Sequence, residues 1–320
     1  MPAGLSSPPR REKPAEGPPA QGAAHLMLGP GKRYWKDRII RGLLFLAAAS
    51  SVVVTTGIVA ILLAESMVFF RQAPLWEFLT GTNWAPRNGH FGILPLVSGT
   101  LVTTAVALAV ALPVGTIIAI YLSEYAPFAL REIIKPVLEL LSAVPTVIYG
   151  YFALLFVTPQ LQKIFPNLQT FSMLSAGIVM GIMIIPYVSS LSEDAMRAVP
   201  MLLREGAYAL GANKMITSIK VVYPAALSGI GAAYILGISR AIGETMIVSI
   251  AAGTGPRLTW NPAEPAATIT AYIVQVCQGD LPHGSVGYQS IFAAGLTLFL
   301  MTLGFNILGH ILRKRFREAY

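Results

Sequence analysis

Two ionisable residues, Arg240 and Glu244, lie near the middle of an apolar stretch of about 25 residues. A charge at the centre of a membrane-spanning helix costs about 2.5 to 3.5 kcal/mol, so such side chains normally face protein or water instead of lipid. Residues four apart lie about 40° apart around a helix, on one face. In a continuous helix the same face carries small residues, namely Ala233, Gly237 and Ala251.

This face predicts the lining of an anion path. The guanidinium of Arg240 offers planar, permanently charged donors that fit the oxygens of an oxyanion such as phosphate. Glu244 partly neutralises that charge, which keeps binding weak enough for release. The alternative is a self-neutralised pair that only joins this helix to its neighbours.

The composition places these charges in a membrane protein. Of 320 residues, 54% are hydrophobic and 12% are charged, which is more apolar surface than a water-soluble domain of this size can bury. The formal charge of +8 does not indicate nucleic acid, because Lys and Arg flank apolar segments instead of forming one basic soluble face. With one cysteine, Cys277, and no Cys/His cluster, the sequence predicts neither an intrachain disulfide nor a metal or other cofactor.

Six stretches are long and apolar enough to cross a hydrocarbon core about 30 Å thick. They are centred on Leu43–Ala64, Leu96–Tyr121, Ile134–Val157, Phe171–Leu191, Ala225–Ala251 and Ser290–Leu312. We therefore predict an all-α, polytopic membrane protein with six transmembrane helices over residues 39–320. Residues 1–38, rich in Pro, Gly, Ala and basic residues, predict a disordered tail. Several segments contain proline, at Pro113, Pro145 and Pro186, which neighbouring helices can tolerate inside a membrane bundle.

The distribution of basic residues predicts the orientation. Eighteen Lys and Arg lie in the N-terminal region, in residues 122–135 and 192–224, and after Ile311, against four in the opposite connections. By the positive-inside rule, both termini and the loop 193–224 face the cytoplasm. On the outer side, Ala266–Cys277 is too short to span and predicts an interfacial or re-entrant helix. Gly177 and Gly181, four residues apart, predict close helix packing.

The loop 193–224 begins with the pattern of a short amphipathic helix. Between Pro200 and Gly211 the apolar residues fall at i, i+4 and i+7, which places them on one face: Leu203, Ala207 and Leu210. Arg204 and Glu205 point elsewhere in this pattern. Gly211 is predicted to end the helix, because glycine readily adopts the left-handed conformation. Pro224 is predicted in the first turn of the next helix, where its missing N–H costs little.

This stretch, EGAYALGANKMITSIKVVYP, resembles the EAA loop of ABC importer permeases, whose pattern is Glu-Ala-Ala, three residues, Gly, nine residues and Ile-x-Leu-Pro. Four positions match in register: Glu205, Ala207, Gly211 and Pro224. Gly206 replaces the first Ala of the pattern, and Val221 and Tyr223 replace Ile and Leu. The resemblance implies a coupling helix that inserts into a cleft on a cytoplasmic ATPase subunit, with Glu205 making polar contacts and Gly211 setting the turn.

Residues 40–315 resemble more specifically the PstC-type permeases of phosphate ABC importers. The stretches that carry this resemblance are Phe91–Pro127, Leu138–Leu154 and Ser239–Gly253. The resemblance implies the type I importer permease fold in a prokaryotic cytoplasmic membrane, and a path for phosphate that includes Arg240 and Glu244. It also implies four kinds of partner: a second homologous permease, two ATPase subunits that bind the ATP, an extracytoplasmic phosphate-binding protein and the lipid bilayer.

The sequence leaves other functions open. GPGKR, at Gly29–Arg33, lacks the spacing and the Ser/Thr of a nucleotide-binding loop, so ATP hydrolysis is expected in separate subunits. The substrate could be another oxyanion, such as sulfate or molybdate. A stand-alone secondary transporter would usually show an internal repeat, which the sequence lacks. A membrane sensor, with the loop recruiting a signalling partner, is the remaining alternative.

Overall fold

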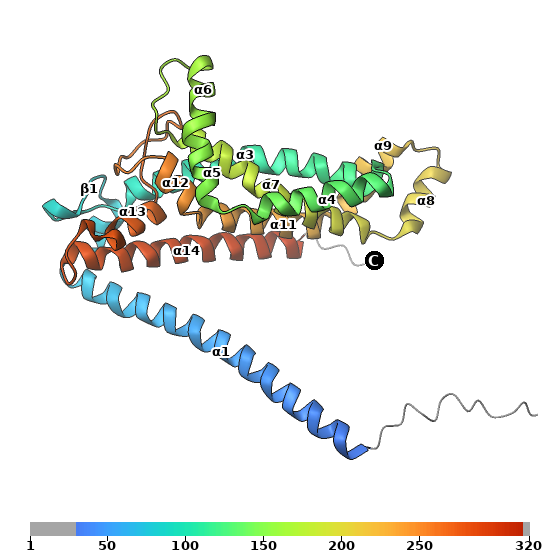
Figure 1. Ribbon diagram of the computed structural model, residues 1–320, viewed down its shortest axis with the longest axis horizontal. Coiled ribbons are helices and arrows are strands. Elements are labelled where there is room, and N and C mark those ends of the chain that lie inside the picture. The colour runs from blue at the N-terminus through green and yellow to red at the C-terminus, as the bar shows by residue number, and fades with distance from the viewer. Residues whose placement is uncertain (1–29, 316–320) are drawn as a thin grey trace, which may run out of the picture. The chain divides into compact units, whose positions relative to one another are not determined.

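The computed structural model describes residues 30–315, and these are almost entirely helical (Figure 1). The long elements are α1 (Pro30–Phe70), α3 (Leu94–Ile120), α4 (Phe128–Ala143), α7 (Met173–Arg197), α11 (Leu227–Ile242) and α14 (Val286–Arg315). The short helices and strands are α2 (Leu75–Thr80), β1 (Trp84–Ala85), η2 (Pro86–Asn88), β2 (His90–Phe91), α5 (Thr146–Phe152), α6 (Thr158–Ile164), α8 (Met201–Ala209), α9 (Lys214–Thr217), α10 (Tyr223–Ala225), α12 (Met246–Ala251) and α13 (Ile269–Gln275). Four π-helical turns complete the set: η3 (Tyr121–Tyr125), η4 (Ala153–Val157), η5 (Ser218–Val222) and η6 (Val276–Asp280).

The described residues contain four helices that are long and apolar enough to cross a membrane, or up to six if two bent pairs each count as one span. The four continuous ones are Asp37–Phe70, Leu94–Tyr125, Met173–Arg197 and Val286–Ile311. The fold is therefore all-α and polytopic, as the sequence predicts. Pro113 and Pro186 lie inside α3 and α7, which continue past them.

The third predicted segment, Ile134–Val157, is not one straight helix. α4 and the continuous run Thr146–Ile164 meet at an angle of 88°. The bend falls at Val144, whose ψ of 129° is extended, and at Pro145. A residue before proline is driven out of the helical region by the ring, so a proline that was expected inside a span ends the helix instead.

The fifth predicted segment, Ala225–Ala251, is broken twice. Helix already runs from Lys214 to Ala225, and it bends by 72° at Ala226 before α11. Pro224 lies in the first turn of the short helix α10, as a first-turn proline was predicted, but α10 continues the run from Lys214 and is separated by the bend from α11. The π-helical turn η5 lies just before Pro224 in this run. Proline has no N–H to donate to a carbonyl of the preceding turn, so the regular helical hydrogen bonding is interrupted there. α11 ends at Ile242, and residues 243–245 separate it from α12.

α3, α7, α11 and α14 lie side by side and form the body of the fold (Figure 1). Gly177 and Gly181 lie where α7 crosses α3, as predicted. A Cβ at Gly181 would lie 2.7 Å from the main-chain oxygen of Ala107, and one at Gly177 would lie 2.7 Å from Val106. Small residues allow helix backbones to approach closely, which is a main source of helix association in membranes.

Gly181→Ala is expected to destabilise the protein by about 1 to 3 kcal/mol, because the added methyl group meets backbone that cannot move aside. The check is the thermal midpoint in detergent, with Gly304→Ala as the matched control, since a Cβ at Gly304 meets nothing within 4 Å. Equal midpoints for the two variants would contradict the close contact.

The chain forms two compact units, which divide between Ile58 and Val59. In the first unit, the side chains of α1 from Asp37 onward are nearly all exposed. Apolar surface of this extent is expected against lipid or another membrane helix. α1 begins at Pro30, so helix starts before the predicted end of the tail at residue 38, and residues 1–29 of that tail lie outside the described residues.

The predicted outer helix is present as α13 and lies inside the second unit. Residues 266–272 are all buried, and α13 contacts α3, α12 and α14. An aromatic cluster packs beside it, with the Trp84 and Tyr272 rings 5.0 Å apart. Protein therefore surrounds α13. Irregular backbone at the depth of a membrane is tolerated where it is buried in protein, because its polar groups can find partners there.

Candidate functional site

Arg240 lies in the last turn of α11, at the end of a helix that stops inside the bundle. Its guanidinium carbon lies 4.8 Å from the centroid of the Tyr187 ring on α7, a cation–π contact. Its Nε is buried and has no hydrogen-bond partner. Among the ion pairs of the described residues, none includes Arg240. The structure therefore places a permanent, partly buried cation, with no carboxylate partner among the described residues, beside α7 in the helix bundle.

Glu244 does not lie on the helix face of Arg240, which corrects the sequence-based geometry. The helix ends at Ile242, and Glu244 stands in the connection to α12, 7% exposed. Its Oε1 accepts hydrogen bonds from the main-chain N–H groups of Met246 and Ile247, at 3.1 and 3.3 Å. A carboxylate there satisfies donors that a helix start leaves free. The predicted common face is also divided, because Ala251 belongs to α12 and not to α11.

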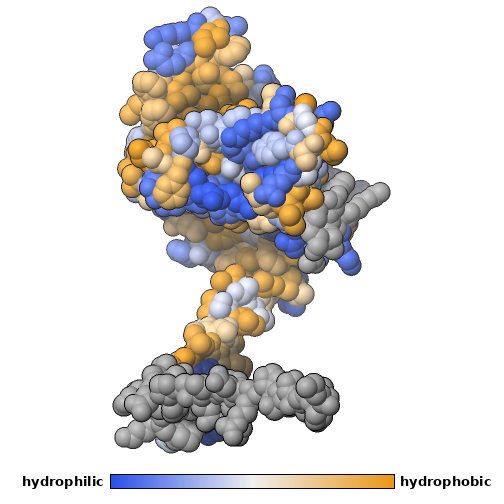
Figure 2. Space-filling view, turned by 90° about the vertical axis from the view of Figure 1, so that its right-hand side faces the viewer, coloured by the Kyte–Doolittle hydropathy of each residue, from blue (hydrophilic) through white to orange (hydrophobic). Residues whose placement is uncertain are grey.

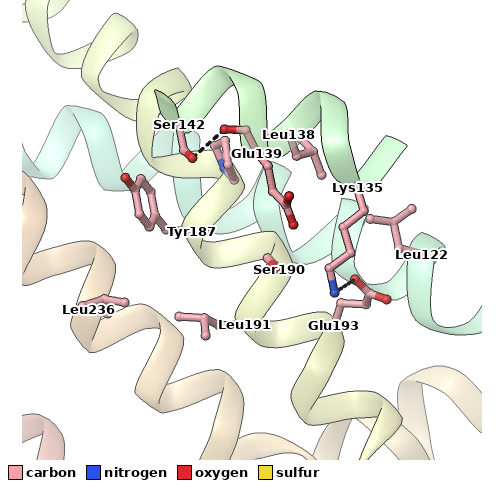
Figure 3. Close-up of a pocket in the computed structure, with 11 residues that line it drawn as sticks. Leu122, Lys135, Leu138, Glu139, Ser142, Tyr187, Ser190, Leu191, Glu193 and Leu236 are labelled. Carbon is pink, nitrogen blue, oxygen red and sulfur yellow. Dashed lines mark hydrogen bonds and ion pairs between the residues drawn. The ribbon is translucent and has the colours of Figure 1, made fainter. Parts of the chain in front are cut away.

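Tyr187 also lines a cavity of about 270 Å³ between α4, α7 and α11 (Figure 3). Ser142 and Glu139 of α4 line one side, Ser190 of α7 the other, and Leu236 of α11 borders it. Its far end is closed by Lys135 and Glu193, which are joined in Figure 3. Nothing in the sequence singled out Tyr187, because an aromatic residue in an apolar helix usually indicates packing alone.

Glu193 is fully buried at the junction of α4 and α7, and three cations surround it. Arg131 Nε lies 2.5 Å from Oε1, Lys135 Nζ 3.5 Å from Oε2, and Arg197 Nη1 3.9 Å from Oε1. A buried carboxylate without such partners would be strongly destabilising.

The predicted loop begins later than residue 193, because Glu193 to Arg197 form the last turn of α7.

α8 and α9 form the projecting end of the predicted loop (Figure 1). Glu205 and Gly206 are exposed on α8, whereas Ala207 is buried. Of the predicted apolar face, Leu203 packs inward as expected, but Leu210 is 90% exposed. α8 ends at Ala209, so Leu210 lies past the helix and the i+7 pattern no longer applies to it.

The turn after α8 follows the prediction. Gly211 has φ of 82°, the left-handed conformation. Its N–H donates to the Tyr208 carbonyl at 2.9 Å, and the Ala212 N–H donates to the Ala207 carbonyl at 3.0 Å. These bonds satisfy carbonyls at the helix end. The Asn213 side chain then accepts from the Ile216 N–H at 2.8 Å and starts α9.

The end of the molecule that carries α8 and α9 presents a mixed surface. Figure 2 looks onto this end and shows hydrophilic residues gathered beside hydrophobic ones. Large apolar side chains that stand out from it include Leu202, Leu210 and Met215, which are 78%, 90% and 63% exposed. Apolar residues rimmed by polar ones are typical of a protein-binding surface.

Four membrane-length helices, two bent helix pairs and a projecting two-helix loop, all within the described residues, define a membrane-embedded protein with a docking surface at one end. The family profile described as "Binding-protein-dependent transport system inner membrane component" matches residues 111–318. The chain belongs to this family.

Curated relatives and a solved structure agree with this assignment. The chain is 34% identical to the "Probable ABC transporter permease protein YqgH" of Bacillus subtilis, over 85% of this chain and 87% of that protein. It is 33% identical to the "Phosphate transport system permease protein PstC" of Mesorhizobium japonicum, over 80% of this chain and 84% of that protein. A chain of a bacterial ABC transporter that imports alginate superposes with a TM-score of 0.60 at 16% identity, over 90% of this chain and 100% of that chain. The predicted PstC-type resemblance and the ABC importer permease fold are confirmed.

Proposed function

We propose that this chain moves inorganic phosphate across the cytoplasmic membrane as one permease subunit of an ATP-driven importer. The observation that carries the proposal is Arg240, a partly buried cation of the helix bundle with no carboxylate partner among the described residues and with a buried, unpaired Nε. Such a group favours an anion whose oxygens replace the missing acceptors. Several relatives at about this level of similarity are named for phosphate transport.

The role of Glu244 in this proposal is to hold the broken helix beside the path. Its carboxylate caps α12, and its main-chain oxygen accepts the hydroxyl of Thr270 at 2.7 Å. The break therefore stays fixed against α13. Arg240 supplies the positive charge, and the Tyr187 ring holds its guanidinium in place. Because Arg240 is in no salt bridge among the described residues, phosphate can bind it without first breaking one.

The remaining machinery is proposed to come from partners. A second, homologous permease completes the path, and an extracytoplasmic binding protein delivers phosphate. Two ATPase subunits bind and hydrolyse ATP, and one of them receives α8 and the turn at Gly211. This assignment needs the loop and both termini on the cytoplasmic side, as the distribution of Lys and Arg indicates.

The test is uptake of labelled phosphate, sulfate and molybdate by the complete complex in proteoliposomes, with the ATPase subunits present or omitted. We expect ATP-dependent uptake of phosphate at least about tenfold above the other two oxyanions, a ratio that needs only about 1.4 kcal/mol of discrimination. A preference for sulfate or molybdate would support the alternative substrate. Uptake that persists without the ATPase would refute an ATP-driven importer.

A further inference from the structure

Arg204, beside Glu205 on α8, is buried and points into the protein. The sequence pattern predicted only that it does not lie on the apolar face of this helix. It is 9% exposed. Its Nη1 donates to the Val199 carbonyl at 2.6 Å, and its Nη2 donates to the Met196 carbonyl at 2.8 Å. Carbonyls at the end of α7 are a favourable site for a cation. Arg204 thus fixes α8 to the end of α7.

The same guanidinium reaches a second transmembrane helix. Its Nη2 lies 2.9 Å from Oε1 of Glu124, in the turn η3 that ends α3, and the two side chains are only 11% and 5% exposed. Lys214, at the start of α9, adds a cation–π contact to the same turn, 5.0 Å from the Tyr125 ring. Among the ion pairs of the described residues, Glu124–Arg204 is the one that joins α8 to the end of α3.

α3 in turn contacts the helix that carries Arg240. The Thr116 hydroxyl on α3 and the Tyr234 hydroxyl on α11 lie 2.6 Å apart. α3 also packs along α7, which holds Tyr187. A displacement of α8 therefore has a bonded route to α3, and α3 contacts both helices around the guanidinium.

Neighbouring residues of α8 face opposite ways. Glu205 is exposed, on the side proposed to meet the ATPase, whereas Arg204 is buried against α3 and α7. We infer that the Glu124–Arg204 ion pair transmits movement of α8 to α3, and that it sets how much transport follows from each ATP hydrolysed. This inference rests on the proposed function, and Glu124 and Arg204 are positioning residues in it.

The test uses the complete complex with Glu124→Gln. We expect the ATPase subunits to copurify at the wild-type level, because the outer face of α8 is unchanged. The ratio of ATP hydrolysed to phosphate imported is expected to rise about tenfold, within the range typical of coupling between linked sites. Glu132→Gln is the matched control, since Glu132 is exposed on α4, and it should keep the wild-type ratio.

A double-mutant cycle with Arg204→Gln separates transmission from folding. If the pair carries the coupling, the double variant raises the ratio no further than the worse single variant. A wild-type ratio in Glu124→Gln would overturn the inference, and so would a loss of uptake that only follows lost ATPase copurification. Absence of phosphate import by the wild-type complex in the same assay would instead refute the proposed function.

Discussion

Arg240→Gln is expected to reduce phosphate uptake at least roughly a hundredfold, while the complex with the ATPase subunits still assembles. Hydrogen bonds to a charged group contribute about 1.5 to 3 kcal/mol each, and glutamine removes both the charge and the planar fork of donors. Assembly is expected to persist because Arg240 makes no ion pair among the described residues that its removal would break. The measurement is ATP-dependent uptake in proteoliposomes, normalised to the amount of assembled complex.

Two variants control for this result. Arg257→Gln removes an exposed charge in the connection after α12 and is expected to keep wild-type uptake. Arg240→Lys keeps the charge but not the fork, so it should fall between wild type and Arg240→Gln. Normal uptake by Arg240→Gln would show that the path does not need this cation, and loss of assembly would assign Arg240 a structural role.

Glu205→Arg and Gly211→Trp are each expected to abolish copurification of the ATPase subunit. Glu205 is exposed on the outer side of α8, so reversing its charge changes the docking surface without disturbing the packed side. Gly211 has φ of 82°, a conformation that costs a non-glycine residue roughly 1 kcal/mol or more. Tryptophan there also adds bulk to the turn that the partner is proposed to receive.

Glu132→Arg reverses an exposed charge on α4, outside the loop, and is the control for Glu205→Arg. It should retain the ATPase subunit. Affinity purification from detergent, followed by quantification of the ATPase band, measures the effect. Retention of the ATPase by both Glu205→Arg and Gly211→Trp would exclude the turn as its docking site, and the thermal midpoint of the permease shows whether either variant simply unfolds.

Much of the fold follows from features that are local in the sequence. Apolar runs of about 20 residues identify membrane-length segments, because hydrocarbon excludes unpaired backbone and polar side chains. Gly211 ends α8 because its conformation depends on the residue itself. The packing of Gly177 and Gly181 was likewise predictable, since small residues at i and i+4 form one surface in any helix.

The bends and the geometry of the site could not be predicted from local sequence features alone. Four prolines lie in predicted spans, but only Pro145 lies at a bend between helices, whereas Pro113, Pro136 and Pro186 remain inside theirs. From their spacing in the sequence, Arg240 and Glu244 were predicted to lie on one face of the same helix. Glu244 instead lies in the break at residues 243–245 that follows α11, and its carboxylate caps α12.

The sequence by itself determined the class of protein, the membrane segments and the loop that projects from them. Only the tertiary structure decided which charges are paired. Arg204 meets Glu124, Glu193 meets Arg131, and Arg240 meets the ring of Tyr187. The physical reason is that burial in hydrocarbon is a property of a single segment, whereas the partner of a buried charge lies on another helix and is fixed by how the helices pack.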